Sequence, residues 1–235
     1  MANRAGPRIV TNNLTLDIDV AKTSSYSGSG LTAYDLKTSA IGGTLVNGVS
    51  FDSSNSGSFS FDGINDFILI PNSYLPSSNE ATICIWNYGI NATTQSVFSA
   101  MRSDNIRILN IHLPWSDNVV YWDAGQSAGS YDRINTSTLT NAQWQGWHFW
   151  AFTKNASTGV MEIYLDGVLF DTITKTQTSY TAPYYYYLGS GKIASWPNGG
   201  NMTLNGNISN FIFYTRALSA SEIFQNYNST KGRYL

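Results

Sequence analysis

The chain has 235 residues, of which 42% are hydrophobic, 14% are aromatic and only 12% are charged, and its net charge is −2. Because about 25% of the residues in an average soluble protein are charged, this surface must be polar but mostly neutral. The absence of a basic run excludes a nucleic-acid partner held through phosphates, and no apolar run approaches the ~18 residues of a membrane span. The lone Cys84 excludes a disulfide scaffold, and Met1 to Val10 holds no apolar segment typical of a secretion signal.

Short runs of β-branched and aromatic residues, separated by Gly, Asn and Ser clusters, predict an all-β domain. The predicted strands, in chain order, are residues 58–61, 67–70, 82–86, 106–113, 119–122, 147–153, 160–165, 168–173, 184–188 and 208–214. The clearest hairpin turns at Asp166-Gly167, because this pair suits the positive φ angles of a type I′ turn. The alternation along these strands predicts two stacked antiparallel sheets.

A short helix is predicted at the C-terminal end. Ser219 and Glu222 form a capping box, and Ile223 and Tyr227 follow on one helix face, which we expect to cover the sandwich. We predict one domain over residues 1–235, with 1–12 as an N-terminal arm and 219–235 as a helix and tail. The basic residues at both ends belong either to solvated tails or to arms that dock on a neighbouring subunit.

Several motifs in a fixed order resemble those of laminin-G-like, concanavalin A-like jelly-roll domains. The matching segments are FSFDGINDF (59–67), WHFWAFT (147–153), MEIYLDG (161–167), LGS (188–190), GNISNF (206–211) and YTRALS (214–219). This resemblance implies a two-sheet antiparallel jelly roll with a short C-terminal helix. It also implies either carbohydrate binding or glycoside hydrolysis, because this fold hosts both lectins and glycoside hydrolases.

The N-terminal stretch is similar to the leader of such domains in tailed-phage virion proteins. The segments that carry this similarity are residues 6–11, 14–17, 25–30 and 43–48. Two segments depart from the family pattern, namely residues 35–43 and 208–210, and the second lacks the acidic residues usual there. The resemblance implies a jelly-roll module displayed on a phage particle.

Catalytic residues are not predicted. Hydrolysis on this fold needs two carboxylates about 5–10 Å apart, and the family's Glu-x-Asp-x-Glu strand is absent. Glu162 and Asp166 would lie about 13 Å apart at ~3.3 Å per residue, and Asp166 already serves the turn. His112 and His148 are the only histidines, and no Gly-x-Ser-x-Gly occurs. We therefore expect no enzyme.

A metal site is conceivable in one turn only. Asp62, Asn65 and Asp66 cluster there, and calcium prefers several such oxygen ligands. The alternative is that these side chains hydrogen-bond to the backbone of their own turn. No other cofactor is expected.

Two segments combine aromatic rings with amide and charged groups, as sugar-binding sites do. The carbohydrate-binding candidates are Trp115, Asp117, Tyr121, Trp122, Asp123, Tyr131, Arg133, Trp196 and Asn198. The alternative for the first segment is that Tyr121 or Trp122 packs inward and that Asp132 and Arg133 form a local ion pair.

Assembly contacts form the last group of candidates. In the run Tyr184 to Tyr187, two rings must face outward on a strand, which favours an interface. The candidate contacts are Arg4, Arg8, Tyr185, Tyr187 and Arg233.

Our leading hypothesis is a non-enzymatic virion structural protein on a phage head or tail. Its expected partners are other virion proteins, further copies of itself and host surface glycans, with no membrane insertion. The alternative is a free carbohydrate-binding module, and a glycoside hydrolase is the least favoured interpretation.

Overall fold

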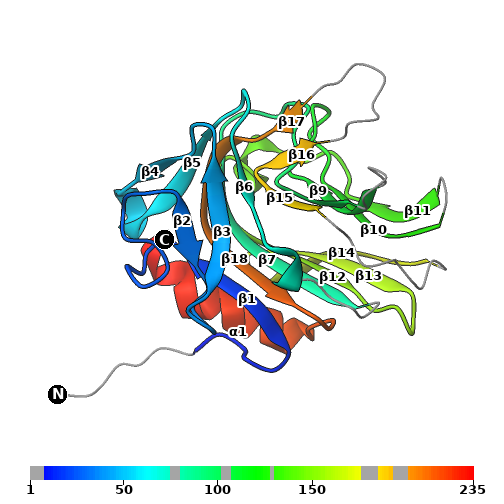
Figure 1. Cartoon of the computed structure of the whole chain (residues 1–235). Coiled ribbons are helices and arrows are strands. Elements are labelled where there is room, and N and C mark those ends of the chain that lie inside the picture. The colour runs from blue at the N-terminus through cyan, green and yellow to red at the C-terminus, as the bar shows by residue number, and fades with distance from the viewer. Residues whose placement is uncertain (1–7, 75–79, 102–106, 128–129, 176–184, 193–200) are drawn as a thin grey trace.

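The computed structural model describes residues 8–74, 80–101, 107–127, 130–175, 185–192 and 201–235. These residues form two eight-stranded antiparallel sheets, a two-stranded hairpin and the helix α1 (Ala220–Thr230) (Figure 1). The predicted all-β antiparallel sandwich with a short C-terminal helix is therefore confirmed. Among the described residues, no helix combines the length and apolar character that a bilayer crossing requires.

The first sheet, sheet A, has the strand order β14-β13-β12-β7-β18-β5-β4, and β1 also pairs with β18. Its strands are β14 (Val168–Thr174), β13 (Val160–Leu165), β12 (Gly146–Lys154), β7 (Ala81–Gly89), β18 (Asn205–Tyr214), β5 (Ser58–Asp62), β4 (Ser50–Asp52) and β1 (Leu14–Asp19). The long central strands β12, β7 and β18 are nearly continuously buried, because side chains cover both of their faces.

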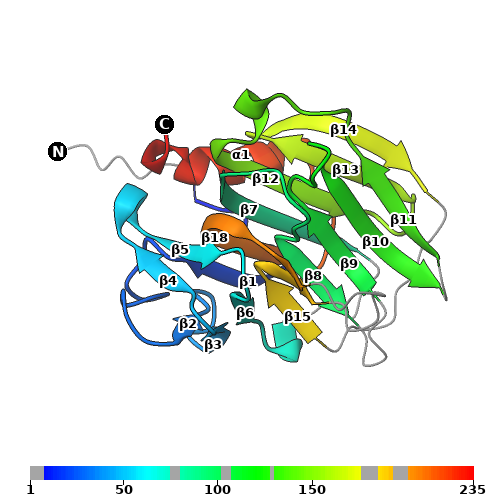
Figure 2. The same cartoon turned by 90° about the horizontal axis from the view of Figure 1, so that it is seen from above.

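The second sheet, sheet B, has the order β11-β10-β9-β8-β15-β6-β3-β2 and lies against sheet A (Figure 2). Its strands are β11 (Ser130–Asn135), β10 (Tyr121–Ser127), β9 (Arg107–His112), β8 (Phe98–Met101), β15 (Tyr185–Leu188), β6 (Phe67–Leu69), β3 (Ile41–Val46) and β2 (Thr32–Tyr34). The hairpin pairs β16 (Ser190–Lys192) with β17 (Asn201–Thr203), and short 3-10 turns occupy 54–56, 72–74, 141–143 and 231–233.

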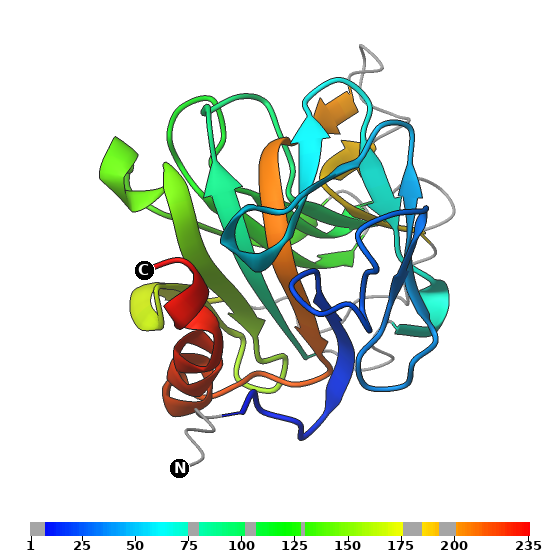
Figure 3. The ribbon, with the colours of Figure 1, turned by 90° about the vertical axis from the view of Figure 1, so that its left-hand side faces the viewer.

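Two hydrophobic cores hold the layers together. The larger core fills the space between the sheets, with Trp122, Trp150, Phe98 and Phe211 among its buried rings. The second core lies between the outer face of sheet A and α1, which lies beside the strands of that sheet at the lower left of Figure 3. Its residues include Cys84, Trp86, Phe149, Tyr164, Tyr214, Ile223 and Tyr227. The predicted covering role of the helix is confirmed.

Local predictions are confirmed where the partners are close in sequence. Asp166 and Gly167 have φ angles of 50° and 80° at the turn between β13 and β14, as a type I′ hairpin requires. The capping box joins the Ser219 side chain to the Glu222 backbone and the Glu222 side chain to the Ser219 backbone. The sequence did not predict β1–β4, β8, β11, β16 and β17, because these strands are short or rich in Gly, Ser and polar residues.

The two ends of the described chain lie against the sandwich. Residues 8–12 run beside α1: Val10 is buried, its N–H donates to Asn226 Oδ1, and its carbonyl accepts from the Tyr214 hydroxyl. At the other end, Tyr234 stacks on Trp86. The chain's own apolar and polar groups therefore hold Val10 and Tyr234 against the sandwich, so these residues are not solvated tails. Docking of the ends on a neighbouring subunit stays a prediction.

Candidate functional site

The outer face of sheet B carries a row of polar side chains. On β10, Trp122 points into the core, so the neighbouring Asp123 points outward. Strand pairing places Ser99, Asn110, Asp123 and Arg133 opposite one another across β8, β9, β10 and β11. Four consecutive strands therefore contribute to one polar row.

An ion pair anchors one end of this row. The Arg133 Nε donates to Asp123 Oδ1 at 2.6 Å, and its Nη2 donates to Asp123 Oδ2 at 2.8 Å. Asp123 is fully buried, and bidentate pairing of this kind fixes both side chains. The Arg133 guanidinium also lies over the Tyr121 ring, 4.8 Å from its centroid.

Tyr121 connects this pair to a loop. Its hydroxyl donates to Asp117 Oδ2 at 2.7 Å, and this hydrogen bond to a carboxylate raises the tyrosine pKa. Asp117 is exposed, and its Oδ1 accepts from the Val119 N–H. The carboxylate therefore sits at the surface in a fixed orientation.

A buried histidine lies beside Tyr121. Asn110 Nδ2 lies 2.8 Å from His112 Nε2, and His112 Nδ1 lies 2.7 Å from the carbonyl oxygen of Gln95. Because a carbonyl only accepts, these partners fit the tautomer with the proton on Nδ1. The Ser96 hydroxyl donates to Asn110 Oδ1 at 3.0 Å and completes the network.

Trp115 covers this network from the loop that joins β9 to β10. Its ring meets His112 edge-on with 4.3 Å between centroids, and the ring is partly exposed. Hydrogen bonds between the backbones of Trp115, Asn118 and Val119 close the loop. We name the set of Trp115, His112, Asp117, Tyr121, Asp123 and Arg133 the Trp115 cluster.

Residues 62–224 match the family model of the concanavalin A-like lectin/glucanases superfamily. The chain belongs to this superfamily. No curated protein sequence matches it.

Solved structures similar to this superfamily member include binding domains of botulinum neurotoxins. One is the neurotoxin DC binding domain in complex with rat synaptotagmin II, with 17% identity and a TM-score of 0.70. A second is the same domain in complex with SialylT, with 15% identity and a TM-score of 0.70. A third is a structure of botulinum neurotoxin type C, whose cell entry depends upon interaction with two ganglioside molecules, with 18% identity and a TM-score of 0.68.

The similarity to these three structures covers 93% of this chain and 52% of each neurotoxin chain. The chain thus spans about half the length of the structures it matches. At these identities the similarity shows the shared fold.

The structure brings together five of the predicted carbohydrate-binding residues and rejects one. Those brought together are Trp115, Asp117, Tyr121, Asp123 and Arg133. The prediction for Trp122 is wrong, because its ring is fully buried in the core and its Nε1 donates to the Thr153 carbonyl oxygen at 3.0 Å.

Three other predicted residues lie partly or wholly outside the part of the chain that the structure describes. Trp196 and Asn198 lie outside the described residues, and only the backbone of Tyr131 is described. Asn110 and Ser96 belong to the polar network although they were not among the predicted site residues. A signal existed, because Asn110 and His112 alternate with buried Leu109 and Ile111.

The alternative ion pair between Asp132 and Arg133 is also wrong. The Lys154 ammonium instead donates to Asp132 Oδ2 at 2.7 Å, and both side chains are buried. Because Lys154 lies on β12 and Asp132 on β11, this pair joins the two sheets, whereas Arg133 points the other way toward Asp123.

Backbone N–H groups of the proposed calcium turn and of the neighbouring Gly48 hold its carboxylates. Asp66 is buried, and its two oxygens accept from the Gly48 and Asp62 N–H groups at 2.7 and 3.1 Å. Asp62 Oδ1 accepts from the Ile64 N–H, and Asn65 is exposed. Within the described ranges, no three His, Cys, Asp or Glu side chains converge as metal ligands. The geometry favours the turn interpretation.

The candidate assembly residues have different environments. Arg233 pairs with Asp19 of the same chain, and its role as an assembly contact stays a prediction. Tyr187 packs edge-on against Phe67, and Arg8 is exposed. Arg4 lies outside the described residues, and nothing is described of the Tyr185 side chain.

The thiol, carboxylate and histidine side chains considered for catalysis elsewhere in the chain make structural contacts. Burial raises the pKa of the Cys84 thiol to about 12, so the thiol packs as a small apolar group. Glu162 accepts from the Tyr164 hydroxyl at 2.9 Å, and Asp166 pairs with His148 at the hairpin.

Proposed function

We propose that this chain is a non-catalytic carbohydrate-binding module and that the Trp115 cluster contacts the sugar. The observation that carries this proposal is a partly exposed indole next to the exposed Asp117 carboxylate and the Tyr121 hydroxyl. A flat aromatic ring suits the C–H face of a sugar, and neighbouring polar groups suit its hydroxyls.

The rigidity of the cluster supports the same role. Trp115 rests on His112, whose ring is held by Asn110 and Gln95, and Tyr121 lies between Asp117 and Arg133. Because these groups are ordered before a ligand arrives, binding loses little conformational entropy. His112, Tyr121 and Arg133 lie on sheet strands, which favours a precise site over an adaptable one. Backbone hydrogen bonds within the loop hold Trp115 beside them.

The chemistry of the cluster favours binding over hydrolysis. Of its two carboxylates, Asp123 is buried and held by Arg133, and Asp117 is the exposed one. Glycoside hydrolysis needs a second carboxylate that can exchange a proton with the substrate. The neurotoxin domains of similar fold are described as binding domains, which agrees with a binding role.

The test is a glycan array followed by titration of the best sugar. We expect Trp115→Ala to weaken binding by roughly tenfold or more, which corresponds to ~1.4 kcal/mol. Phe224→Ala, which removes an exposed ring on α1, is the matched control and is expected to bind normally. Full binding by Trp115→Ala would contradict this choice of site.

A chelator arm tests the calcium hypothesis. Since backbone N–H groups occupy both Asp66 oxygens, we expect sugar binding to persist in excess chelator. Loss of binding that added calcium restores would instead assign the 62–66 turn to a metal.

We also propose display of the module on a phage particle, as a head or tail component with other virion proteins as partners. The support for this proposal is the resemblance of residues 6–11, 14–17, 25–30 and 43–48 to virion leaders. Immunogold labelling of particles from the source tests it: gold on heads or tails is expected, and unlabelled particles would reject it.

A further inference from the structure

A pocket of about 610 Å³ opens on the outer face of sheet A, beside the C-terminal end of α1. Its lining includes Asp17 and Asp19 of β1 and Asn210 of β18. These side chains alternate with the core residues Leu16 and Ile18, so they point away from the sandwich core. The pocket lies on the other sheet from the Trp115 cluster and is independent of it.

The two carboxylates of the pocket differ in their partners. Asp19 is matched by Arg233, whose Nη1 and Nη2 donate to Oδ1 and Oδ2 at 2.6 and 2.7 Å. Asp17 is also buried, at 7% exposure, yet within the described chain it forms no ion pair. The side-chain donor that reaches it is Asn210 Nδ2, at 3.3 Å. Within the described chain, Asp17 is therefore in direct contact with no cation, and Lys22 acts on it only through its charge.

Asn210 provides a second, independent sign of a missing partner. It is 2% exposed, and its Nδ2 donates to Asp17 Oδ1 and to the Ile18 carbonyl oxygen. Its own Oδ1 accepts no hydrogen bond from the described residues. A buried acceptor without a donor costs about 1–3 kcal/mol, so an occupant that donates hydrogen bonds here would be favoured.

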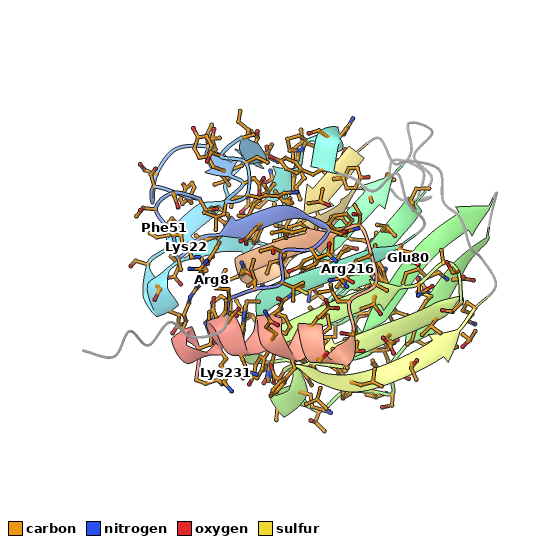
Figure 4. The ribbon with its side chains drawn as sticks, turned by 90° about the horizontal axis from the view of Figure 1, so that it is seen from below. Arg8, Lys22, Phe51, Glu80, Arg216 and Lys231 are labelled. Atoms are coloured by element: carbon orange, nitrogen blue, oxygen red, sulfur yellow. The ribbon has the colours of Figure 1, made fainter. Side chains whose placement is uncertain are left out.

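Positive charges surround these buried acceptors. Lys22 is 55% exposed and 3.8 Å from Asp19, Arg8 is exposed, and the Lys37 ammonium donates to the Leu14 carbonyl oxygen. Figure 4 shows Arg8 between β1 and α1 and Lys22 near the end of β1, whereas Lys231 lies on the other side of the helix. The pocket thus has unmatched acceptors inside and cations at its mouth.

We propose that this pocket binds a small zwitterion of the amino-acid class, with its ammonium at Asp17 and Asn210 and its carboxylate at Lys22 and Arg8. An ammonium group only donates hydrogen bonds, which suits the inner acceptors, and a carboxylate suits the cations. The cations at the mouth would repel a ligand that carries only a positive charge, and the Asp17 carboxylate would repel a ligand that carries only a negative charge. A zwitterion can place its ammonium at the inner acceptors and its carboxylate at the cations of the mouth.

Protonation provides a signature of this binding mode. Burial is the main cause that raises the pKa of Asp17 to about 7, and the charges of Asp19 and Asp35 add to it while Lys22 opposes it. The remaining charged groups of the pocket are Arg8, Lys37 and Arg233. A bound ammonium stabilises ionised Asp17, so binding near pH 6.5 releases a proton, whereas a bound anion would cause proton uptake.

The experiment is calorimetric titration at pH 6.5 in two buffers of different ionisation enthalpy. The probes are glycine, 4-aminobutanoate and 6-aminohexanoate, with butylamine and butanoate as single-charge comparisons. We expect at least one amino acid to bind with proton release and to bind more tightly than either single-charge probe. Failure of all three amino acids to bind, or butanoate binding with proton uptake, would overturn the proposal.

Variants locate the two ends of the ligand. Asp17→Asn is expected to abolish proton release and to weaken binding roughly tenfold, whereas Asp171→Asn on β14 leaves both unchanged. Lys22→Gln is expected to weaken binding without loss of proton release, and Lys231→Gln is its control. Unchanged proton release in folded Asp17→Asn would contradict the assignment, and the wild-type measurement stands even if a variant fails to fold.

Discussion

The ring of Tyr234 lies nearly parallel to the indole of Trp86, with 4.1 Å between ring centroids and 25° between planes. The Trp86 Nε1 donates to Thr230 Oγ1 at 2.7 Å, and the Tyr234 hydroxyl donates to Ser209 Oγ at 2.7 Å. The last residues of the chain thus close the second core over the middle of sheet A.

From this contact we predict that Tyr234→Ala lowers the free energy of unfolding by about 2–3 kcal/mol, because it uncovers Trp86 and leaves a cavity. Urea denaturation measures the change. Leu235→Ala is the control, since that side chain is 79% exposed and should contribute little. Equal stability of Tyr234→Ala and the wild type would show that the stacking is energetically unimportant.

The buried pair between Lys154 and Asp132 gives a second prediction. Lys154→Met should lower the free energy of unfolding by about 3–5 kcal/mol, because it leaves the Asp132 carboxylate buried without its cation. The double variant Lys154→Met/Asp132→Leu should recover most of this loss, since it removes both charges. A double-mutant cycle in chemical denaturation measures the coupling, and additive losses would contradict it.

The start of α1 gives a pH prediction. Arg216 donates to both Glu222 oxygens, at 2.5 and 2.8 Å, and lowers the pKa of Glu222 from 4.5 to about 2. This carboxylate therefore contributes stability above pH 4.5 that is lost as pH falls toward 2. Because solvent screens this partly exposed pair, we expect the ionised Glu222 to contribute about 1–2 kcal/mol to the free energy of unfolding.

Glu222→Gln tests this linkage by denaturation between pH 2 and pH 7. The variant should be less stable than the wild type at neutral pH, and the difference should shrink below pH 4. A pH-independent difference would mean that the Glu222 charge contributes nothing and that only its packing matters.

Asp17 has the opposite linkage. Its folded pKa of about 7 exceeds the ordinary value of 3.8, so the folded protein holds a proton that the unfolded chain has lost. Stability is therefore highest at low pH with respect to this group, and it falls as pH rises from about 4 to about 7. The free energy of unfolding of Asp17→Asn should exceed that of the wild type by about 2–4 kcal/mol at pH 8 and should differ little from it at pH 4. Thermal or urea unfolding at both pH values checks this, and a gain that does not grow with pH would contradict it.

Much of the sandwich could be predicted from alternation along the strands. Runs such as Thr82 to Trp86 and Ile208 to Tyr214 combine β-branched and aromatic residues, and they became the central strands β7 and β18. The N-terminal strands escaped prediction because Ile41–Val46 contains two glycines and Ser50–Asp52 has only three residues. Pairing with neighbours, more than local propensity, makes such segments strands.

The candidate site was partly predictable for the same reason. The dense aromatic and charged residues between Trp115 and Arg133 marked the segment in which the structure gathers the Trp115 cluster. Alternation already forbids Tyr121 and Trp122 from facing outward together, but only the sheet shows which of them turns inward. The partners of Asp132 and Arg133 were likewise hidden, because these neighbours lie on opposite faces of β11.

The sequence by itself determined the units whose partners are a few residues apart: the Asp166-Gly167 hairpin, the Ser219–Glu222 cap and the in-out pattern of each strand. Only the tertiary structure decided which distant groups meet, as when Asp19 pairs with Arg233 across 214 positions and Asn210 reaches Asp17 across 193. The physical reason is that backbone geometry fixes local hydrogen bonds, whereas long-range pairs depend on how the strands are ordered in the sheets.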